Sequence, residues 1–304
     1  MTKIAAVILN YNNIDETVRC IEEFKAQKEN LQLVVVDNNS IDESHQVLSK
    51  RKDIYYIQTY ENLGYAKGNN VGIEYILKNM DVDLIIISNN DIHFANNSTL
   101  TIIKETIKKI PTNWGYLGTV IKDSNGHLAQ YYPNKHTTFL ERIVNSSLFG
   151  VPFRKFFFKK DTLEKGINNL IESEIVSGAF FILNPNAVKK IGAFDPYTFL
   201  YGEERILAKK YYNSGYKGYI TRDVFVEHEN SATTKRYPTI SYVNSLKSEY
   251  YYFIKYKSFS KAKETSLVSI RLIDTLIRVI IGNLHKETFL KTLKMYLRIK
   301  KELK

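Results

Sequence analysis

Three short apolar runs in the sequence are each followed by amide or carboxylate side chains. The runs are Val7 to Leu9, Val34 to Val36 and Ile85 to Ile87. The polar residues after the three runs are Asn10, Tyr11 and Asn12; Asp37 and Asn38; and Asn89, Asn90 and Asp91. Carboxylate and amide oxygens bind hard divalent cations, and the face of an aromatic ring can stack on a nucleotide base. If the three runs are neighbouring strands, these groups share one rim and favour a site for a nucleotide and a divalent metal.

Each run is too short for a buried helix and rich in β-branched residues, which predicts a strand covered on both faces. Further predicted elements are helices over residues 14–27, 42–50 and 66–78 and a strand over residues 54–57. Asp15 and Asp42 are expected to start the first two helices. The alternation predicts a doubly wound α/β fold with a mostly parallel sheet, flanked by helices, which binds nucleotides at the carboxyl ends of its strands.

The alternation is weaker after residue 90. The elements predicted there are a helix over residues 99–110 and strands over residues 116–121 and 175–183. Residues 123–172 carry few regular signals, and long loops of this kind tend to be lids or binding loops, so acceptor recognition is expected there. Residues 154–160 mix Arg and Lys with Phe. Two interpretations stay open for them: a solvated helix face over the core, or a surface that meets a lipid or an acceptor.

The positive charge is concentrated at the C-terminal end. The 304 residues carry a net charge of +11, and residues 238–304, with 14 Lys and Arg against 5 Asp and Glu, contribute +9 of it. The longest apolar candidate, residues 267–284, is interrupted by charges, so a membrane span is not expected. Because the first strand begins at Ile4, a secretion signal has no room, and the single Cys20 fits a reducing compartment. We expect a cytoplasmic location.

Residues 238–304 are predicted to be helical, with an amphipathic and basic final helix. One stripe of that helix holds Phe289, Leu293, Tyr296 and Leu297, and another face holds Lys291, Lys294, Arg298 and Lys301. Two interpretations stay open: docking on the α/β domain, or contact with an anionic membrane surface, where each basic residue contributes about 1 kcal/mol. Nucleic acid is disfavoured because no recognised nucleic-acid module is present.

Six motifs occur in a fixed order along the chain. They are Asn10-Tyr11-Asn12, Val36 to Ser40, Asn62 to Asn70, Asn89-Asn90-Asp91, Ser177 to Phe180, and Gly202-Glu203-Glu204. Over about residues 3–230 the set resembles the inverting glycosyltransferases of family two, and more closely the rhamnosyltransferase-like branch of bacterial surface-polysaccharide synthesis. The resemblance implies a GT-A fold, a nucleotide-sugar donor and a divalent cation.

The resemblance also implies which residues bind the donor. Tyr11 matches the position whose ring packs on the donor base, and Asn38 takes the place of the group that hydrogen-bonds the base. Because an amide both donates and accepts, Asn38 can read uracil or thymine. Lys67 lies near the position that the family often fills with a cationic side chain facing the donor phosphates. The implied donor-binding set is Asn10, Tyr11, Asp37, Asn38, Lys67 and Asn90.

The metal ligands follow from the same resemblance. Asn89-Asn90-Asp91 takes the place of the family's DxD-type motif, in which Asp91 offers the only carboxylate. A cation bound there would retain water ligands and would be coordinated by the donor phosphates as well. His228 resembles the family's later metal ligand, which favours Mn2+ over Mg2+. The alternative for His228 is a structural histidine at a strand end.

Glu203 and Glu204 are the candidate catalytic acids. Glu204 matches the general base, which removes the proton of the acceptor hydroxyl, although the family usually has Asp there. Glu203 would bind a donor or acceptor hydroxyl. The alternative is that both residues only favour the start of a helix, where negative charge is stabilised. Asp195 resembles a loop residue near the acceptor and could equally cap a turn.

These expectations define an inverting glycosyltransferase. It would move a sugar from dTDP-rhamnose or a UDP-hexose to a polysaccharide or lipid-linked glycan, as a peripheral protein on the inner face of the cell membrane. Residues 1–237 would form the GT-A domain, with a donor half (1–122) and an acceptor half (123–237), and residues 238–304 a basic helical tail. A catalytically inactive scaffold of a membrane assembly is the alternative. A nucleotidyltransferase is weaker, because the Gly- and Lys-rich loop expected after its first strand is absent.

Overall fold

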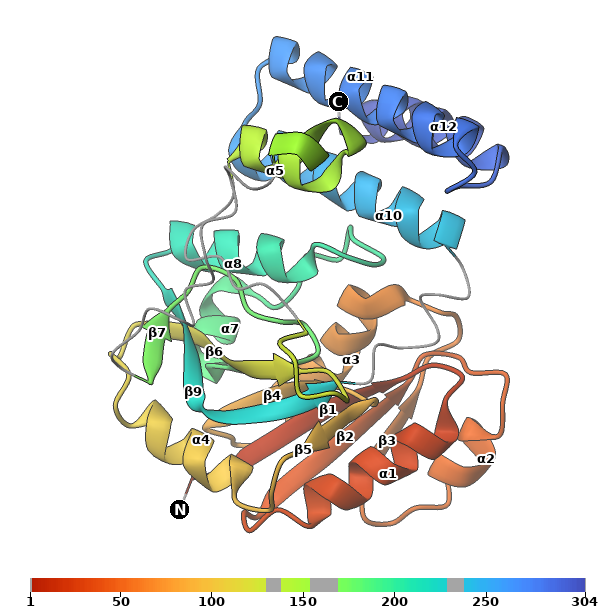
Figure 1. Ribbon diagram of the computed structural model, residues 1–304. Coiled ribbons are helices and arrows are strands. Elements are labelled where there is room, and N and C mark those ends of the chain that lie inside the picture. Colours follow the sequence, from red (N-terminus) through yellow and green to blue (C-terminus); the bar gives the residue numbers. More distant parts are fainter. Residues whose placement is uncertain (1, 130–137, 154–168, 229–237, 304) are drawn as a thin grey trace.

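The computed structural model describes residues 2–129, 138–153, 169–228 and 238–303. It has two layers, an α/β layer and a layer of helices packed on one side of it (Figure 1). Residues 154–160, for which the sequence leaves two interpretations open, lie outside the described residues.

The amino-terminal half alternates strand and helix. Its elements are β1 (Ile4–Asn10), α1 (Ile14–Lys25), β2 (Leu31–Asp37), α2 (Ser44–Leu48), β3 (Tyr55–Gln58), α3 (Gly64–Asn79) and β4 (Leu84–Asn89). Strands β3, β2, β1 and β4 lie side by side in that order and are parallel. The predicted alternation is confirmed, and the three predicted helices and the strand over residues 54–57 lie within two residues of their expected bounds. Short buried runs of β-branched residues leave few options other than strands.

The start of α1 differs from its prediction. Asp15 lies in the first turn of α1 and does not cap it. Instead, Asp42 receives hydrogen bonds from the backbone N–H groups of Ile14, at 3.3 Å, and Ser44, at 3.0 Å. One carboxylate thus binds at the starts of both α1 and α2. The sequence pattern could not show this, because Asp42 reaches α1 across two neighbouring strand ends.

The carboxyl-terminal half extends the sheet with mixed pairing. Its elements are β5 (Ile92–Phe94), α4 (Thr99–Ile107), β6 (Trp114–Lys122), β7 (Leu170–Glu172), β8 (Phe180–Leu183), α7 (Pro185–Ile191), α8 (Glu203–Asn213) and β9 (Lys217–His228). Strand β8 runs antiparallel between β4 and β6, and β9 pairs with β6 and β5. In the last of these pairs His228 lies opposite Ile92, so the end of β9 reaches the residues that follow β4.

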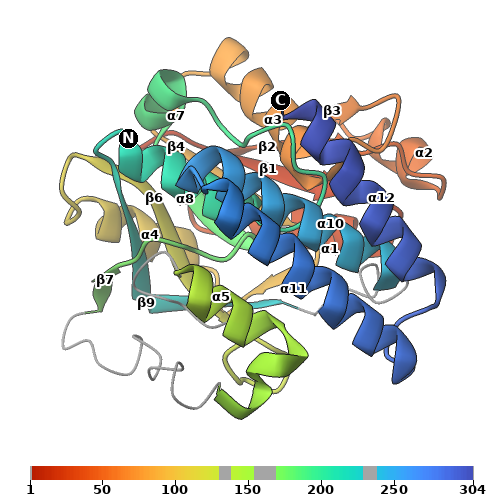
Figure 2. The same ribbon diagram turned by 90° about the horizontal axis from the view of Figure 1, so that it is seen from above.

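The helical layer combines two distant parts of the chain. Its elements are α5 (Phe139–Ser146), the 3-10 helix η1 (Leu148–Phe153), α10 (Pro238–Tyr251), the π-helix η3 (Tyr252–Tyr256), α11 (Lys261–Ile280) and α12 (Glu287–Glu302). Figure 2, seen from above, shows these helices lying over the α/β layer. The expectation that residues 123–172 lack regular structure was therefore wrong for α5, whose start carries a capping box of Thr138 and Glu141.

A buried ion network holds the two parts of this layer together. Both nitrogens of Arg271 that face Glu249 donate to its carboxylate, at 2.7 and 2.8 Å, and Arg142 of α5 donates to the same carboxylate at 2.7 Å. Burial would raise the pKa of Glu249, but the charges of Arg271 and Arg142 hold it below its usual range. The packing unit formed by residues 238–303 thus includes residues 138–153, which the sequence assigned to the other domain.

Asp195 links the α/β layer to the helical layer through hydrogen bonds and an ion pair. Its carboxylate receives hydrogen bonds from the hydroxyls of Tyr251, at 2.8 Å, and Tyr256, at 2.5 Å, and lies 3.3 Å from the amine of Lys255. Tyr197, two residues further on, stacks on Tyr251 with ring centroids 4.1 Å apart. Asp195 also accepts the backbone N–H of Tyr197, which fits the turn-capping alternative.

Helix α12 packs on the layer through a stripe that overlaps the predicted one at Tyr296. Its buried residues are Thr288, Thr292, Tyr296 and Ile299. Leu297, expected on the buried stripe, keeps 59% of its surface exposed. Thr288 on the buried stripe bonds the hydroxyl of Thr239 at 3.0 Å, a polar contact that a purely apolar pattern does not anticipate. No helix in the described part of the chain combines the length and the hydropathy needed to cross a bilayer.

Candidate active site

Two adjoining cavities open at the carboxyl ends of the strands. The strand-tip cavity, about 350 Å³, is lined by Leu9, Tyr11, Asn38, Asn62, Gly64, Tyr65, Asn89, Asn90, Asp91, Phe199, Leu200, Ile240 and Ser241. The acid cavity, about 480 Å³, is lined by Glu203, Glu204 and His228 among others, mainly from residues 175–179 and 200–205. Tyr65, Asn89 and Leu200 belong to both, so the two cavities share one wall.

Two of the predicted donor-binding residues lie beneath the strand-tip cavity rather than in it. Asn10 and Asp37 are fully buried at the ends of β1 and β2, and the Asn10 amide donates to Asp37 at 3.0 Å. Asp37 also accepts from the backbone N–H and the hydroxyl of Ser40. These bonds fix the turn after β2, which shapes the cavity floor.

Asn38 lines the cavity, and its side chain is hydrogen-bonded to the loop before α3. Its amide nitrogen donates to Asn62 at 3.0 Å and to the carbonyl of Gly64 at 3.2 Å. Its oxygen accepts from the N–H of Leu63 at 3.0 Å. The Thr59 hydroxyl lies 3.3 Å from the same oxygen, but its single proton has a closer acceptor, the carbonyl of Glu61 at 2.8 Å. An Asn side chain has two donors and two acceptor positions, so Asn38 holds the loop before α3 and keeps an acceptor position.

The remaining donor-binding candidates divide between the cavity and the surface. Tyr11 is half-buried and lines the cavity, where its ring is accessible to a ligand. Asn90 lines it too, and its amide donates to the hydroxyl of Thr17 at 2.8 Å. Lys67 is exposed on α3 and lines neither cavity, so the structure does not bring it to the others.

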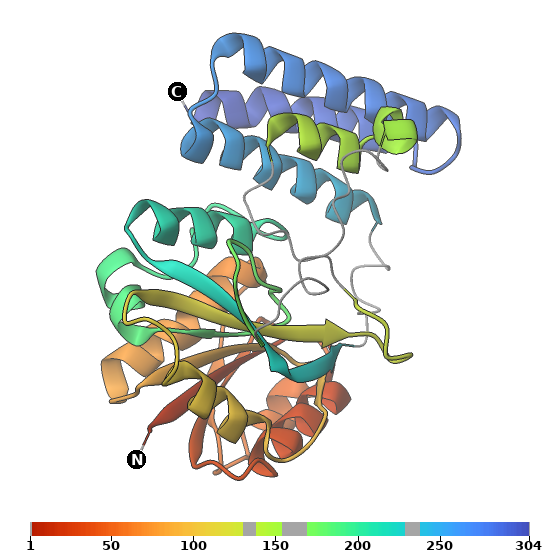
Figure 3. The same ribbon diagram turned by 60° about the vertical axis from the view of Figure 1, so that its left-hand side comes forward.

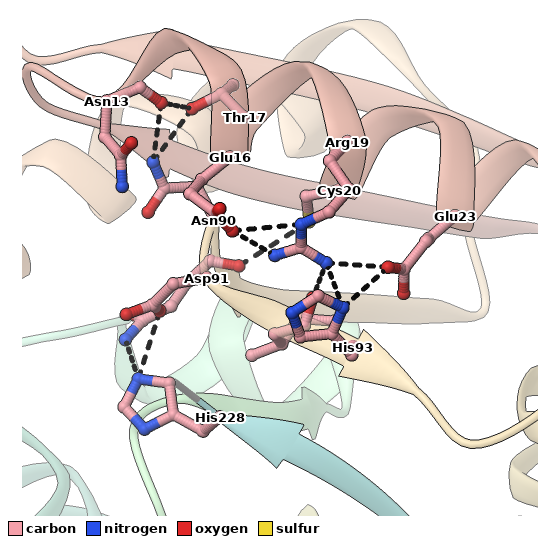
Figure 4. A network of polar contacts seen from close by, with 12 residues as sticks. Asn13, Glu16, Thr17, Arg19, Cys20, Glu23, Asn90, Asp91, His93 and His228 are labelled. Atoms are coloured by element: carbon pink, nitrogen blue, oxygen red, sulfur yellow. Dashed lines mark hydrogen bonds and ion pairs between the residues drawn. The ribbon is translucent and has the colours of Figure 1, made fainter. Parts of the chain in front are cut away.

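Asp91 and His228 form the candidate metal centre. His228 Nε2 lies 3.0 Å from Oδ1 of Asp91 and 3.2 Å from the amide of Asn89 (Figure 4). Asp91 is only 5% exposed, and apart from the His228 ring its carboxylate oxygens have no hydrogen-bond partner among the described residues. A buried carboxylate with so few partners is costly unless a cation neutralises it. These two side chains therefore fit one divalent cation.

The protein supplies few ligands for that cation. Within the described ranges, no cluster of three or more His, Cys, Asp or Glu side chains is arranged to hold a metal ion. A hard cation takes about six ligands, so most of the coordination sphere has to come from water and from a bound substrate. Asp91 and His228 thus suit a metal that arrives with, or is completed by, a phosphate-bearing ligand.

Arg19 of α1 supports the metal centre from behind, and sequence reasoning missed it. Its guanidinium donates to the carbonyl of Ile92 at 3.0 Å and is held by ion pairs with Glu16 and Glu23 (Figure 4). His93 lies against the same group. Arg19 therefore fixes the residues directly after Asp91. The clue in the sequence was the spacing Glu16, Arg19, Glu23, which places all three on one helix face.

The two glutamates start helix α8 after an unusual turn. Tyr201 and Gly202 both have left-handed backbone conformations, with φ of 71° and 84°. Such a conformation strains a residue with a side chain, and strain of this kind gathers at functional sites. The turn directs Glu203 and Glu204 into the acid cavity.

Burial sets the protonation of this acid pair. Burial raises the pKa of Glu203 well above its usual range, and the charge of Glu204 raises it further. Burial also raises the pKa of Glu204. Oε1 of Glu203 has no hydrogen-bond partner within the structure. Because two neighbouring carboxylates avoid sharing two charges, we assign the proton of the pair to Glu203 and the charge to Glu204.

The Glu204 carboxylate lies over Gly178. A Cβ atom at Gly178 would be 1.9 Å from Oε1 of Glu204, so only glycine leaves room for the acid. Tyr65 donates its hydroxyl to the carbonyl of Gly178 at 2.5 Å, and burial, together with the charge of Glu204, raises the pKa of Tyr65 well above its usual range. Tyr65, which the sequence did not single out, thus holds the shared wall of the two cavities.

A mixed sheet with a parallel amino-terminal half and polar strand ends, together with a candidate metal centre and a buried acid pair around joined cavities, defines a protein of the GT-A class. Residues 5–167 match the family model described as glycosyl transferase family 2. That match covers more than half of the 304 residues. The chain belongs to glycosyltransferase family 2.

The chain is similar to proteins that are named for sugar transfer. It is 25% identical over 206 residues to the low-salt glycan biosynthesis hexosyltransferase Agl10 of Haloferax volcanii, an overlap of 66% of this chain and 59% of the relative. The chain thus spans less than two thirds of that relative's length. It also spans 44% of a longer S. aureus TarS structure.

Solved structures share the fold. S. aureus TarS 1-349 in complex with UDP-GlcNAc superposes with a TM-score of 0.57 at 15% identity, covering 97% of this chain and 79% of that chain. The mannosyltransferase PcManGT from Pyrobaculum calidifontis, in complex with GDP-Man and Mn2+, gives 0.56 at 13% identity, with coverage of 96% and 84%. At these identities the likeness establishes the fold alone.

Proposed function

We propose that this chain is an inverting glycosyltransferase that uses a nucleotide-diphosphate sugar. The observation that carries the proposal is the shared wall of the two cavities. Tyr11 and Asp91 line one cavity and Glu204 the other, and Tyr65, Asn89 and Leu200 line both. A donor in the strand-tip cavity would present its anomeric carbon to an acceptor hydroxyl in the acid cavity.

Glu204 is the proposed general base. It takes the proton of the acceptor hydroxyl while that oxygen forms a bond to the anomeric carbon, and the bond from that carbon to the diphosphate oxygen breaks. The protonated Glu203 beside it would bind a sugar hydroxyl. Attack from the face opposite the diphosphate inverts the anomeric configuration. A divalent cation held by Asp91 and His228 would neutralise the negative charge of the diphosphate.

Two lines of support point to different donor sugars. The sequence motifs resemble the rhamnosyltransferase-like branch, which favours dTDP-rhamnose. Agl10 is named a hexosyltransferase, and the TarS structure holds UDP-GlcNAc, which favours a UDP-hexose. Both donors carry a pyrimidine base and a diphosphate, so the proposed site is the same for the two.

The proposed acceptor is a polysaccharide or lipid-linked glycan at the inner face of the cell membrane. Helix α11 and the turn after it expose the apolar side chains of Leu276, Ile280 and Ile281, and residues 238–304 carry a net charge of +9. Exposed apolar and basic groups together suit an anionic membrane surface. Flotation with anionic vesicles tests this: Leu276→Ser with Ile280→Ser should lose binding, whereas Ile41→Ser, on the α/β layer, should not.

Substitution Glu204→Gln tests the proposed reaction. The variant keeps the shape of the side chain and cannot accept a proton, so sugar transfer should stop while nucleotide binding is unchanged. Transfer at the wild-type rate would reject Glu204 as the base. An inactive scaffold is the competing function, favoured by the single carboxylate among residues 89–91. A scaffold would release no nucleoside diphosphate from any donor in the presence of Mn2+ and acceptor glycan.

A further inference from the structure

The strand-tip cavity has a wall that does not come from the α/β layer. Ile240 and Ser241, in the first turn of α10, line it opposite residues of β1, β2 and β4. Figures 1 and 3 show α10 as the helix of the helical layer that lies nearest the α/β layer. Ile240 keeps 49% of its surface exposed, although it is a large apolar residue at a cavity rim.

The position of this first turn is fixed from several sides. Thr239, beside Ile240, is buried and bonds Thr288 of α12. Further along α10, the hydroxyl of Ser248 donates to the carbonyl of Leu200 at 3.4 Å, and Tyr251 donates to Asp195. The helix therefore meets the cavity with its orientation set by contacts at both ends.

Phe199 and Leu200, in the loop before α8, contact both α3 and α10. The carbonyl of Phe199 accepts the N–H of Tyr65 at 2.8 Å, and it would lie 2.3 Å from a Cβ atom at Gly64. Phe199 and Leu200 line the same cavity as Ile240. A continuous set of contacts thus runs from the start of α3 through residues 199–200 to α10.

We propose that the first turn of α10 is part of the nucleotide-binding site, with Ile240 as an apolar contact for the nucleoside of the donor. The inference rests on the proposed function, because it takes the donor as the occupant of the strand-tip cavity. Tyr11 offers an aromatic face on one side of the cavity, and Ile240 offers aliphatic surface on another. A nucleoside between them would bury apolar surface on both of its sides.

This arrangement links donor binding to the helical layer. A ligand that contacts α10 stabilises the conformation in which α10 is docked, and the docked helix in turn raises affinity for the ligand. Nucleotide binding should therefore slow hydrogen exchange in residues 238–251 as well as around Tyr11 and Asn38. Protection around Tyr11 and Asn38 without any change in α10 would overturn the inference.

The variant Ile240→Ala tests the contact directly. Titration of dTDP and UDP with Mn2+ should give a Kd about 10-fold weaker than that of the wild type, equivalent to about 1.4 kcal/mol. Ile273→Ala is the matched control, because Ile273 is 50% exposed on α11 and does not line the cavity. Ile240→Trp, which would fill the cavity, should bind weaker still.

The outcomes separate this inference from the proposed function. If the wild type binds neither nucleotide, the proposed function falls and the inference falls with it. If the wild type binds and Ile240→Ala matches Ile273→Ala, the donor site stands and α10 has no part in it. A loss confined to Ile240→Ala and Ile240→Trp, with thermal unfolding of the unliganded variants unchanged, supports the inference.

Discussion

His228 Nε2 lies 3.0 Å from Oδ1 of Asp91, because the antiparallel pair of β5 and β9 brings the end of β9 to the residues that follow β4. Apart from that imidazole, the carboxylate has no hydrogen-bond partner among the described residues, and its position at the strand-tip cavity suits a cation as a further counter-charge. Asp91 would supply the negative charge of the metal centre and His228 a nitrogen ligand, so substituting each should change the metal dependence of nucleotide binding in a different way.

Asp91→Asn should abolish the effect of Mn2+ on nucleotide binding, because the amide is neutral and a weaker ligand. His228→Gln should keep the effect but raise the Mn2+ concentration for half-saturation by at least about 10-fold, since losing even an outer partner of a metal ligand costs 10–100-fold. Calorimetric titration of UDP at several Mn2+ concentrations measures both. An unchanged Mn2+ requirement in both variants would contradict the metal centre.

Gly178→Ala should slow sugar transfer by on the order of 100-fold, because a Cβ atom would displace the Glu204 carboxylate and a misplacement of about 1 Å has that effect. Glu204→Asp draws the carboxylate back by one methylene and should also be slow. In the double variant the shorter acid clears the new methyl group, so its rate should exceed the product of the two single effects. Additive losses would show that Gly178 and Glu204 do not interact.

Glu203→Gln should stabilise the protein at neutral pH. Because the pKa of Glu203 is raised in the folded state, its contribution to stability is full below the unfolded pKa of about 4.3 and is lost as pH rises through the folded pKa. The neutral amide avoids that loss. Thermal unfolding should show a gain of a few degrees at pH 8, where about 1 kcal/mol corresponds to roughly 2–4 °C. The gain should vanish at pH 4; an equal gain at both pH values would contradict the assigned proton.

Glu249→Gln should destabilise the protein by about 3–5 kcal/mol, because it leaves the buried guanidinium of Arg271 without its counter-charge. Urea unfolding followed by circular dichroism measures the change. Glu287→Gln is the control, because its ion pair with Lys291 is exposed at one end of α12 and should leave stability unchanged. Equal effects for the two variants would mean that the network does not hold the helical layer.

Sequence reasoning worked best where the pattern was local and dense. The apolar runs before Asn10, Asp37 and Asn89 gave the parallel strands, and the polar residues after them led to the cavities. Asp91, Glu204 and His228 were all placed at the joined cavities by their motifs. Their roles in binding and catalysis stay predictions.

Sequence patterns could not show where a side chain is used by a distant part of the chain. Asn38 was expected to read a base; its amide nitrogen donates to Asn62 and Gly64 and its oxygen accepts from Leu63, and its role toward a base stays a prediction. Lys67 is exposed on α3 and lines neither cavity. The exposure of Leu297 and the place of Ile240 depend on how α10 and α12 pack, which no single helical pattern encodes.

The helical layer also has a consequence for synthesis of the protein. During translation the sheet is complete soon after β9 leaves the ribosome. The contacts of Arg142 with Glu249 and of Thr239 with Thr288 can form only later, when the second residue of each pair has been synthesised. A nascent chain therefore holds a finished strand-tip rim that still lacks its α10 side.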